Sequence, residues 1–262
     1  MSIAGKPRAA LVTGASKGIG LAIAERIAAA GYRLMIVARS IDVLTEYAVA
    51  LGRRHGADVR PHGADLSDAA AAAGAVDIAV RGFGGIDLLV NCAGATKAGD
   101  FLSLTHQDFV DGFALKFHGA VNLTRAAWPH LVQSGSGHVI NIIGIRAKTP
   151  AAGFTIGGPV NSALFNFTKA MAERGIADGV RVNGVSPGFI RTDRIRGLIE
   201  ALMARDDLSE DAASKRMLAE HGVRRFGTAD EVAAAVLFLD QAGSGYINGA
   251  VIDVDGGLTK GM

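Results

Sequence analysis

Apolar residues follow two alternating spacings along the whole chain. Short, mostly apolar runs predict buried strands at 9–12, 33–38, 57–61, 86–91, 138–143, 180–185 and 250–254. Between them, apolar residues three or four positions apart predict helices at 21–30, 42–55, 67–81, 105–131, 159–177 and 228–239. This alternation of strands and helices predicts a doubly wound α/β fold, with one parallel sheet of about seven strands and helices on both faces.

The segment 188–227 is the least regular part of this pattern. It lies between the sixth predicted strand and the last predicted helix. No linker composition or internal repeat divides the chain, so we interpret 1–262 as a single Rossmann-like domain. In doubly wound folds, such excursions lie beyond the carboxyl ends of the strands, where ligands bind. We therefore expect 188–227 to cover a substrate.

The first strand and helix are joined by a glycine-rich turn, Thr13–Gly20 (TGASKGIG). Glycines let the backbone turn tightly and approach a phosphate closely, and a helix N-terminus offers unpaired N–H groups to the phosphate charge. A glycine-rich loop alone is weak support, because many such loops only reverse the chain. Its position between a buried strand and a helix favours binding of a dinucleotide pyrophosphate.

Composition narrows the classes of protein that fit. The formal net charge is only +2 and the charges are dispersed, so we expect neither a nucleic-acid nor a membrane partner. No uncharged apolar run reaches the roughly 18 residues that a spanning helix needs. One cysteine and scattered histidines predict no disulfide and no metal site. The glycine turn occupies the first 20 residues, where a signal peptide would lie, and we expect a cytoplasmic protein.

Six short motifs follow one another in an order and spacing that resemble the short-chain dehydrogenase/reductase superfamily. They are Thr13–Gly20 (TGASKGIG), Asp65–Leu66, Asn91–Gly94 (NCAG), Val139–Ile143 (VINII), Arg181–Gly188 (RVNGVSPG) and Val254–Gly257 (VDGG). The resemblance covers nearly the whole chain. It implies a nicotinamide-dependent oxidoreductase that acts on a small molecule and assembles as a homodimer or homotetramer.

The resemblance also implies positions for the cofactor. Its contacts fall on Gly14, Ser16, Lys17, Gly18, Ile19 and Gly20 in the turn, on Asp65 and Leu66 at the adenine, on Asn91, Ala93 and Gly94 beside the adenosine, on Asn161 at a ribose, and on Pro187, Gly188, Ile190 and Thr192 at the nicotinamide. Each of these residues taken singly is also compatible with a structural role at a turn or strand end. The ordered set favours the cofactor.

Charge at the end of the second strand predicts NADP(H) in preference to NAD(H). An NAD site places there a carboxylate that binds the ribose 2′-hydroxyl and repels a 2′-phosphate. This chain has Ala38 followed by Arg39, and the first acid is Asp42. Arg39 can bind a phosphate through its planar fork, and Lys17 in the glycine turn can approach the same group.

The resemblance fails at the residues that carry the reaction. The superfamily uses a Tyr-x-x-x-Lys pair, a preceding serine and an asparagine on the long helix before it. The matching positions here are Gly157, Asn161, Gly144 and Lys116. The chain has tyrosines only at 32, 47 and 246, so no realignment supplies the usual proton donor.

Other side chains must then serve the reaction, if there is one. Lys116 and Asn161 are the candidates for catalysis, as though lysine and asparagine had exchanged places, and the two glycines are expected to enlarge the space above the nicotinamide. Burial would favour loss of the Lys116 proton and make it a usable acid or base near neutral pH. The alternative is that Lys116 extends outward past Phe113 and Phe117.

Five more polar residues lie near the predicted reaction space. Arg146 and Lys148 are either solvated loop charges or an anchor for an anionic substrate group, and Thr149 and Thr155 lie in the same loop. His118 is a weaker candidate, since two helical positions turn it roughly 200° away from Lys116.

Three functions fit these observations. The first is an NADP(H)-dependent oxidoreductase with a non-standard proton path. The second is an NADP(H)-binding pseudoenzyme that senses the cofactor or acts as a scaffold. The third is lyase, isomerase or dehydratase chemistry in the same pocket. The apolar residues Leu164, Phe165, Phe167 and Met171 on the helix 159–177 suit packing against another copy of the chain.

Overall fold

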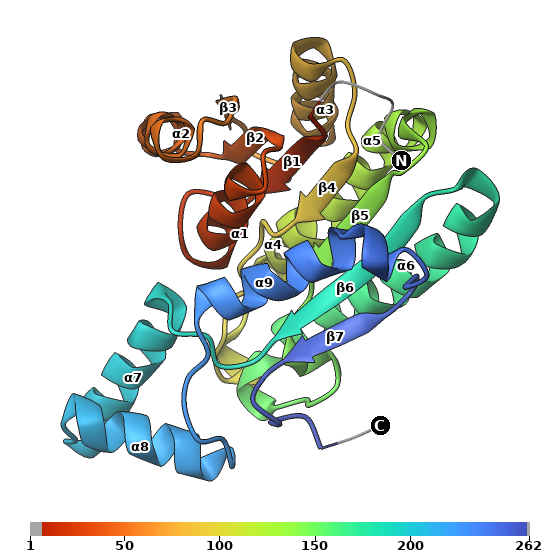
Figure 1. The fold of residues 1–262 in the computed structure, drawn as a ribbon. Coiled ribbons are helices and arrows are strands. Elements are labelled where there is room, and N and C mark those ends of the chain that lie inside the picture. The colour runs from red at the N-terminus through yellow and green to blue at the C-terminus, as the bar shows by residue number, and fades with distance from the viewer. Residues whose placement is uncertain (1–6, 261–262) are drawn as a thin grey trace.

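The computed structural model describes residues 7–260 and contains a seven-stranded parallel sheet (Figure 1). The strands are β1 (Ala9–Thr13), β2 (Arg33–Ala38), β3 (Val59–Gly63), β4 (Leu88–Asn91), β5 (His138–Ile142), β6 (Arg181–Pro187) and β7 (Val251–Val254). Their spatial order is β3-β2-β1-β4-β5-β6-β7, and every neighbouring pair is parallel. The predicted doubly wound fold is confirmed.

Helices cover both faces of the sheet. They are α1 (Gly18–Ala29), α2 (Ile41–His55), α3 (Ala69–Phe83), α4 (His106–Phe113), α5 (Ala120–Ser134), α6 (Gly157–Asp178), α7 (Asp193–Asp206), α8 (Glu210–Glu220) and α9 (Ala229–Asp240). One apolar core joins the sheet to α1, α2 and α9, and a second joins its other face to α3, α5 and α6. Within residues 7–260, no helix is long and apolar enough to cross a bilayer.

Local sequence explains where these helices begin and end. In α2, the buried residues Leu44, Ala48 and Leu51 recur at helical spacing, and Gly56 ends the helix in the left-handed conformation. The Asp68 carboxylate caps α3 by accepting hydrogen bonds from the first backbone N–H groups. Such local rules place most of the predicted boundaries within three residues of those observed.

The helical periodicity predicted at 105–131 is confirmed by a continuous helical rod from His106 to Ser134, but this rod is not one regular α-helix. The chain forms α4, then a π-helical segment at Ala114–Gly119, then α5. A π-helical turn inserts an extra residue without interrupting the helical rod, so an apolar period near 3.6 does not reveal it. Gly119 belongs to this segment, and a Cβ there would lie 2.7 Å from the carbonyl oxygen of Leu66. The π-helical segment therefore lies where the helical rod passes close to the backbone that follows β3.

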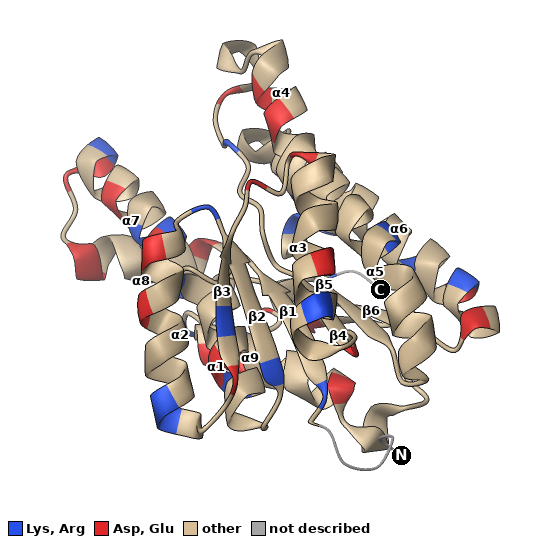
Figure 2. Ribbon diagram, turned by 90° about the horizontal axis from the view of Figure 1, so that it is seen from above, with Lys and Arg blue, Asp and Glu red and all other residues tan. Residues whose placement is uncertain are grey.

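The excursion 188–227 is more regular than its sequence indicates, because it contains α7 and α8. Two backbone hydrogen bonds join the ends of this segment. The Arg191 N–H donates to the Gly227 carbonyl (2.8 Å), and the Gly227 N–H donates to the Phe189 carbonyl (2.8 Å). The two helices share a small core that includes Ile195, Ile199 and Met217. They project beyond the carboxyl ends of the strands (Figure 1). Figure 2 shows basic and acidic residues on α7, and the sequence of α8 also carries both. This charge density conceals their apolar period.

Thr13 fastens together the two strands at the centre of the sheet. Its buried hydroxyl oxygen accepts hydrogen bonds from the backbone N–H groups of Cys92 (2.9 Å) and Ala93 (3.0 Å), just after β4. The glycine turn begins at the next residue, so this contact sets where that turn lies relative to the end of β4.

We expect Thr13→Val to lower the free energy of unfolding by about 2 kcal/mol, because it leaves two N–H groups near the sheet without their acceptor. Thr13→Ser keeps the oxygen and loses one methyl group, so it should cost only about 1 kcal/mol. Urea unfolding of both variants measures the difference. A valine variant as stable as the serine variant would contradict this role for the hydroxyl.

Candidate functional site

The glycine turn forms a cradle at the carboxyl end of β1. Gly14 has φ +68°, and a Cβ on it would lie 2.9 Å from the Cα of Ala93. Gly18 is also left-handed, with φ +55°. Ser16 and Ile19 between and beside these glycines are half-buried. Side chains at the two left-handed positions would strain the turn, so glycine is required for its shape.

The N-terminus of α1 opens directly from this cradle. Its cap residue is Lys17, its first turn holds no acid, and no side chain within residues 7–260 caps its N–H groups. Such an end carries free donors and a partial positive charge, which suits a phosphate. The start of α7 lies close by: the Lys17 ammonium is 3.7 Å from the Asp193 carboxylate, and a Cβ at Gly18 would touch the Thr192 methyl at 3.4 Å.

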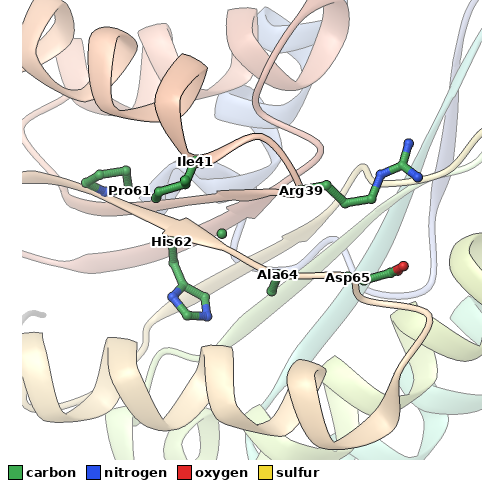
Figure 3. Close-up of a pocket in the computed structure, with 7 residues that line it drawn as sticks. Arg39, Ile41, Pro61, His62, Ala64 and Asp65 are labelled. Atoms are coloured by element: carbon green, nitrogen blue, oxygen red, sulfur yellow. The ribbon is translucent and has the colours of Figure 1, made fainter.

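A pocket of about 610 Å³ lies at the ends of β2 and β3. It is lined by Arg39, Ile41, Pro61, His62, Gly63, Ala64 and Asp65. Figure 3 shows the Arg39 and Asp65 side chains extending toward the same side of the pocket. Hydrogen bonds from the Ser67 hydroxyl (2.7 Å) and N–H (3.0 Å) lower the pKa of Asp65, and the charge of Arg39 adds to this. Arg39 itself is exposed and has no ion pair with the described residues.

Several residues assigned to the cofactor have side chains that serve the core. The Asn91 amide is buried and donates hydrogen bonds to Thr124 (3.2 Å) and Asn141 (2.8 Å). Leu66 and Ile190 are also buried, each in an apolar cluster against one face of the sheet. The Leu66 and Ile190 side chains are enclosed in these clusters, and the buried Asn91 Oδ1 has no hydrogen-bond partner within the described residues.

Backbone packing also governs the segment that follows β6. At Gly188 a Cβ would lie 2.7 Å from the Cα of Asp255, so the two segments pass in close contact. The Thr192 hydroxyl donates a hydrogen bond to the carbonyl of Ile190 (3.2 Å), which shapes the turn into α7. Pro187 ends β6 at the same edge of the sheet as the glycine turn.

Lys116 points inward from the π-helical segment. Gly94, with φ +141°, passes so close that a Cβ on it would lie 2.6 Å from the Cβ of Lys116. The Lys116 ammonium donates a hydrogen bond to the carbonyl oxygen of Ile143 at 2.5 Å, at the end of β5. The outward course past Phe113 and Phe117 is therefore not the one adopted. His118, two residues on, is exposed.

The surroundings of Lys116 favour its neutral form. Burial is the larger cause and the nearby charge of Arg194 the second, and together they lower the pKa of Lys116 to about 8. Burial raises the pKa of the neighbouring Cys92 thiol to about 12, so this group stays protonated. Near neutral pH, Lys116 can therefore gain and lose a proton.

Asn161, Gly144 and Gly157 gather around the same strand end. Asn161 is 8 % exposed, and its Oδ1 has no hydrogen-bond partner within residues 7–260. A Cβ at Gly144 would lie 3.1 Å from the Asn161 amide nitrogen. A Cβ at Gly157 would lie 2.7 Å from the Thr96 hydroxyl, so Thr96 fills part of the space that we expected to be open. Thr96 is distant in sequence, and no motif marks it.

The remaining polar candidates in the loop after β5 differ in the contacts that they make. Lys148 forms an ion pair with Asp253 at 2.7 Å, and the Thr149 hydroxyl donates to the Ile145 carbonyl at 2.9 Å, so both are engaged within the protein. Arg146 stacks over the Phe154 ring, 4.8 Å from its centroid. Arg194, which no motif indicated, lies 6.0 Å from the same centroid.

The three tyrosines lie elsewhere. Tyr32 is buried at the start of β2, where its hydroxyl donates to Asp240 at 2.6 Å. Tyr47 lies in α2, and Tyr246 is fully exposed before β7. None of the three lies at the end of β5, whereas the Lys116 ammonium reaches the Ile143 carbonyl just after that strand.

Comparison with known proteins gives a family. The chain matches, over residues 14–259, the model of the family described as enoyl-(acyl carrier protein) reductase. It is 36 % identical over 249 residues to the short-chain reductase protein NovJ of Streptomyces niveus, which covers 95 % of this chain and 92 % of that protein.

Solved structures agree over the whole fold. L-sorbose reductase from Gluconobacter frateurii, complexed with NADPH and L-sorbose, aligns with a TM-score of 0.93 and 30 % identity over all of both chains. An NADPH-bound short-chain oxidoreductase from Pseudomonas aeruginosa PAO1, described as containing an atypical catalytic center, aligns with a TM-score of 0.89 and 28 % identity over 97 % of this chain and 98 % of that one. The chain belongs to the short-chain dehydrogenase/reductase superfamily of oxidoreductases.

Proposed function

We propose that this chain is an NADPH-dependent reductase of a small carbonyl compound, with Lys116 as the proton donor in place of the superfamily's tyrosine. The observation that carries the proposal is the inward Lys116 ammonium at the end of β5, whose pKa is lowered to about 8. Most residues of this kind on a helix surface remain solvated charges. A lysine near its pKa at neutral pH is matched to general acid catalysis.

The residues present fit the cofactor. The glycine cradle and the open N-terminus of α1 would hold the pyrophosphate, and Arg39 with Lys17 would hold a 2′-phosphate. The buried Asn161 Oδ1, which lacks a partner within the described residues, would accept a hydrogen bond from a ribose hydroxyl. NADPH, when bound, supplies a hydride.

The protein's own residues would then manage charge and protons. A carbonyl that accepts a hydride becomes an alkoxide and needs a proton at its oxygen. The Ile143 carbonyl holds the Lys116 ammonium in place through its hydrogen bond, and the Lys116 N–H bond breaks as the proton passes to the substrate oxygen. The Cys92 thiol stays protonated and does not compete for that proton. The α7–α8 pair, projecting beyond the strands, would cover the substrate.

For the cofactor, we expect tighter binding of NADPH than of NADH, and at least a tenfold loss of NADPH affinity in Arg39→Asp. A charge-assisted contact contributes roughly 1.5–3 kcal/mol, which corresponds to at least tenfold in affinity. Arg53→Asp makes the same charge change at an exposed position of α2 and should leave affinity within about twofold. Fluorescence titration with both cofactors measures this. Equal wild-type affinities would refute the preference.

For the reaction, we expect the rate of carbonyl reduction to fall as pH rises above about 8, because Lys116 must be protonated to act as the acid. The rate should be level below that pH, and the oxidation direction should show the opposite dependence. Lys116→Met should lower kcat for reduction by about 100-fold and abolish this pH dependence. A screen of ketones and aldehydes for loss of NADPH absorbance supplies the assay.

Two controls make this test specific. His118→Gln changes an exposed residue of the same π-helical segment and should leave both kcat and the pH profile unchanged. NADPH affinity should survive Lys116→Met. Undiminished turnover in Lys116→Met and Lys116→Asn would refute the proposed role. NADPH binding without turnover of any substrate would favour the pseudoenzyme hypothesis instead.

The proposal includes self-association and a cytoplasmic location. Leu164 is buried within its own chain, but Phe165, Phe167 and Met171 of α6 are only half-buried and remain available to a second copy. We expect a homodimer or homotetramer. Light scattering at micromolar concentration tests this, and a monomer at all concentrations would refute it.

A further inference from the structure

Two arginines from separate elements meet at one aromatic ring. Arg146 belongs to the short 3₁₀ helix Ile145–Ala147 after β5, and Arg194 to the first turn of α7. Their guanidinium carbons lie 4.8 Å and 6.0 Å from the centroid of the Phe154 ring. An aromatic face holds a guanidinium in a fixed orientation while leaving its N–H groups free for another partner.

Neither arginine is neutralised. Within residues 7–260, Arg146 and Arg194 form no ion pair, and the one hydrogen bond of Arg146 goes to the carbonyl of Thr149 at 3.2 Å. Their sequence neighbours differ in this respect: Lys148 pairs with Asp253 at 2.7 Å, and Arg196 lies 3.5 Å from Asp193. Arg146 and Arg194 thus carry positive charges that no acid pairs with in the described part of the chain.

The pair also lies close to the reaction centre. Burial lowers the pKa of Arg146 and of Lys116, and the charge of Arg194 is the second cause in both, so one guanidinium lies near both groups. Arg146 and Phe154 line a cavity of about 590 Å³ with Thr155, whose buried hydroxyl has no partner in the described part of the chain. No acid pairs with these three cations within the described residues, so an anion that reached them would be attracted by all three charges.

We propose that Arg146 and Arg194 bind an acidic oxygen group, a carboxylate or a phosphate, on the substrate. This inference rests on the proposed reductase function and names its substrate class: a carbonyl compound that carries an anionic group. The planar guanidinium groups of both arginines match the oxygens of such an anion. With the anion held at the arginines, the carbonyl of the substrate would lie on the side of Lys116. Because Arg194 lies on α7, binding would also draw the α7–α8 pair to the substrate.

Matched ligand pairs test the anion requirement without turnover. Acetoacetate and its methyl ester form the carboxylate pair, and glycerone phosphate and glycerone form the phosphate pair. Calorimetric titration into protein saturated with NADP⁺ keeps the phosphate cradle filled and cannot reduce the ketone. We expect the acidic member of at least one pair to bind tenfold or more tightly than its neutral partner. The ligand pair that shows this preference identifies the acidic group as a carboxylate or as a phosphate.

Four variants locate the site. Arg146→Gln and Arg194→Gln should each weaken binding of the acidic ligand about tenfold and leave the neutral ligand unchanged. Lys148→Gln and Arg196→Gln remove the same charge from the same loop and the same helix, and should change the affinity less than twofold. Circular dichroism checks that all four variants fold.

The outcomes separate this inference from the function on which it rests. Equal binding of acidic and neutral members in both pairs, or equal losses in the test and control variants, would overturn the anion site. Rapid NADPH oxidation with neutral ketones alone would overturn it too, while supporting the reductase. Arginine-dependent anion binding with no NADPH oxidation by any ligand would support the anion site and remove the reductase function.

Discussion

The close approach of backbone to backbone at the carboxyl edge of the sheet is the constraint on which the rest of the site depends. Gly14 lies against Ala93, Gly188 against Asp255, and Gly94 against Lys116, each with less room than one added carbon atom needs. The contacts of Gly14 and Gly94 bring the glycine turn and the π-helical segment to the end of β4, and the contact of Gly188 holds the segment after β6 against the segment after β7. Without them, neither a phosphate cradle nor an inward lysine would form.

The inward lysine has an energetic cost that the surroundings only partly offset. Burial disfavours the charged form, and the single hydrogen bond to the Ile143 carbonyl favours it. No acid within the described residues pairs with Lys116, and the neighbouring charge that lowers its pKa further, on Arg194, is also positive. A buried lysine without an acidic partner is more typical of a functional site than of a structural one. An anionic substrate would supply the negative charge that these residues lack.

The similar solved structures bear on how far the fold determines the chemistry of the site. The fold is shared at TM-scores of about 0.9 with NADPH-bound reductases, one of them described as containing an atypical catalytic center, and a shared fold does not by itself fix the chemistry of the site. In this chain the fold places the glycine cradle at the end of β1 and the Lys116 ammonium against the Ile143 carbonyl after β5. In this chain Thr96 packs at the position from which a tyrosine would extend.

The sequence by itself determined the sheet, its covering helices and the glycine cradle, because these follow from local period, capping and backbone freedom. The sequence also identified Arg39 and Lys116, because each places a positive charge at a position that the motifs assign to the cofactor or to the reaction. Only the tertiary structure decided the π-helical turn, the inward course of Lys116, the packing of Thr96 on Gly157, and the difference between paired Lys148 and unpaired Arg146. Each of these depends on contacts between segments far apart in the chain, which no local spacing records.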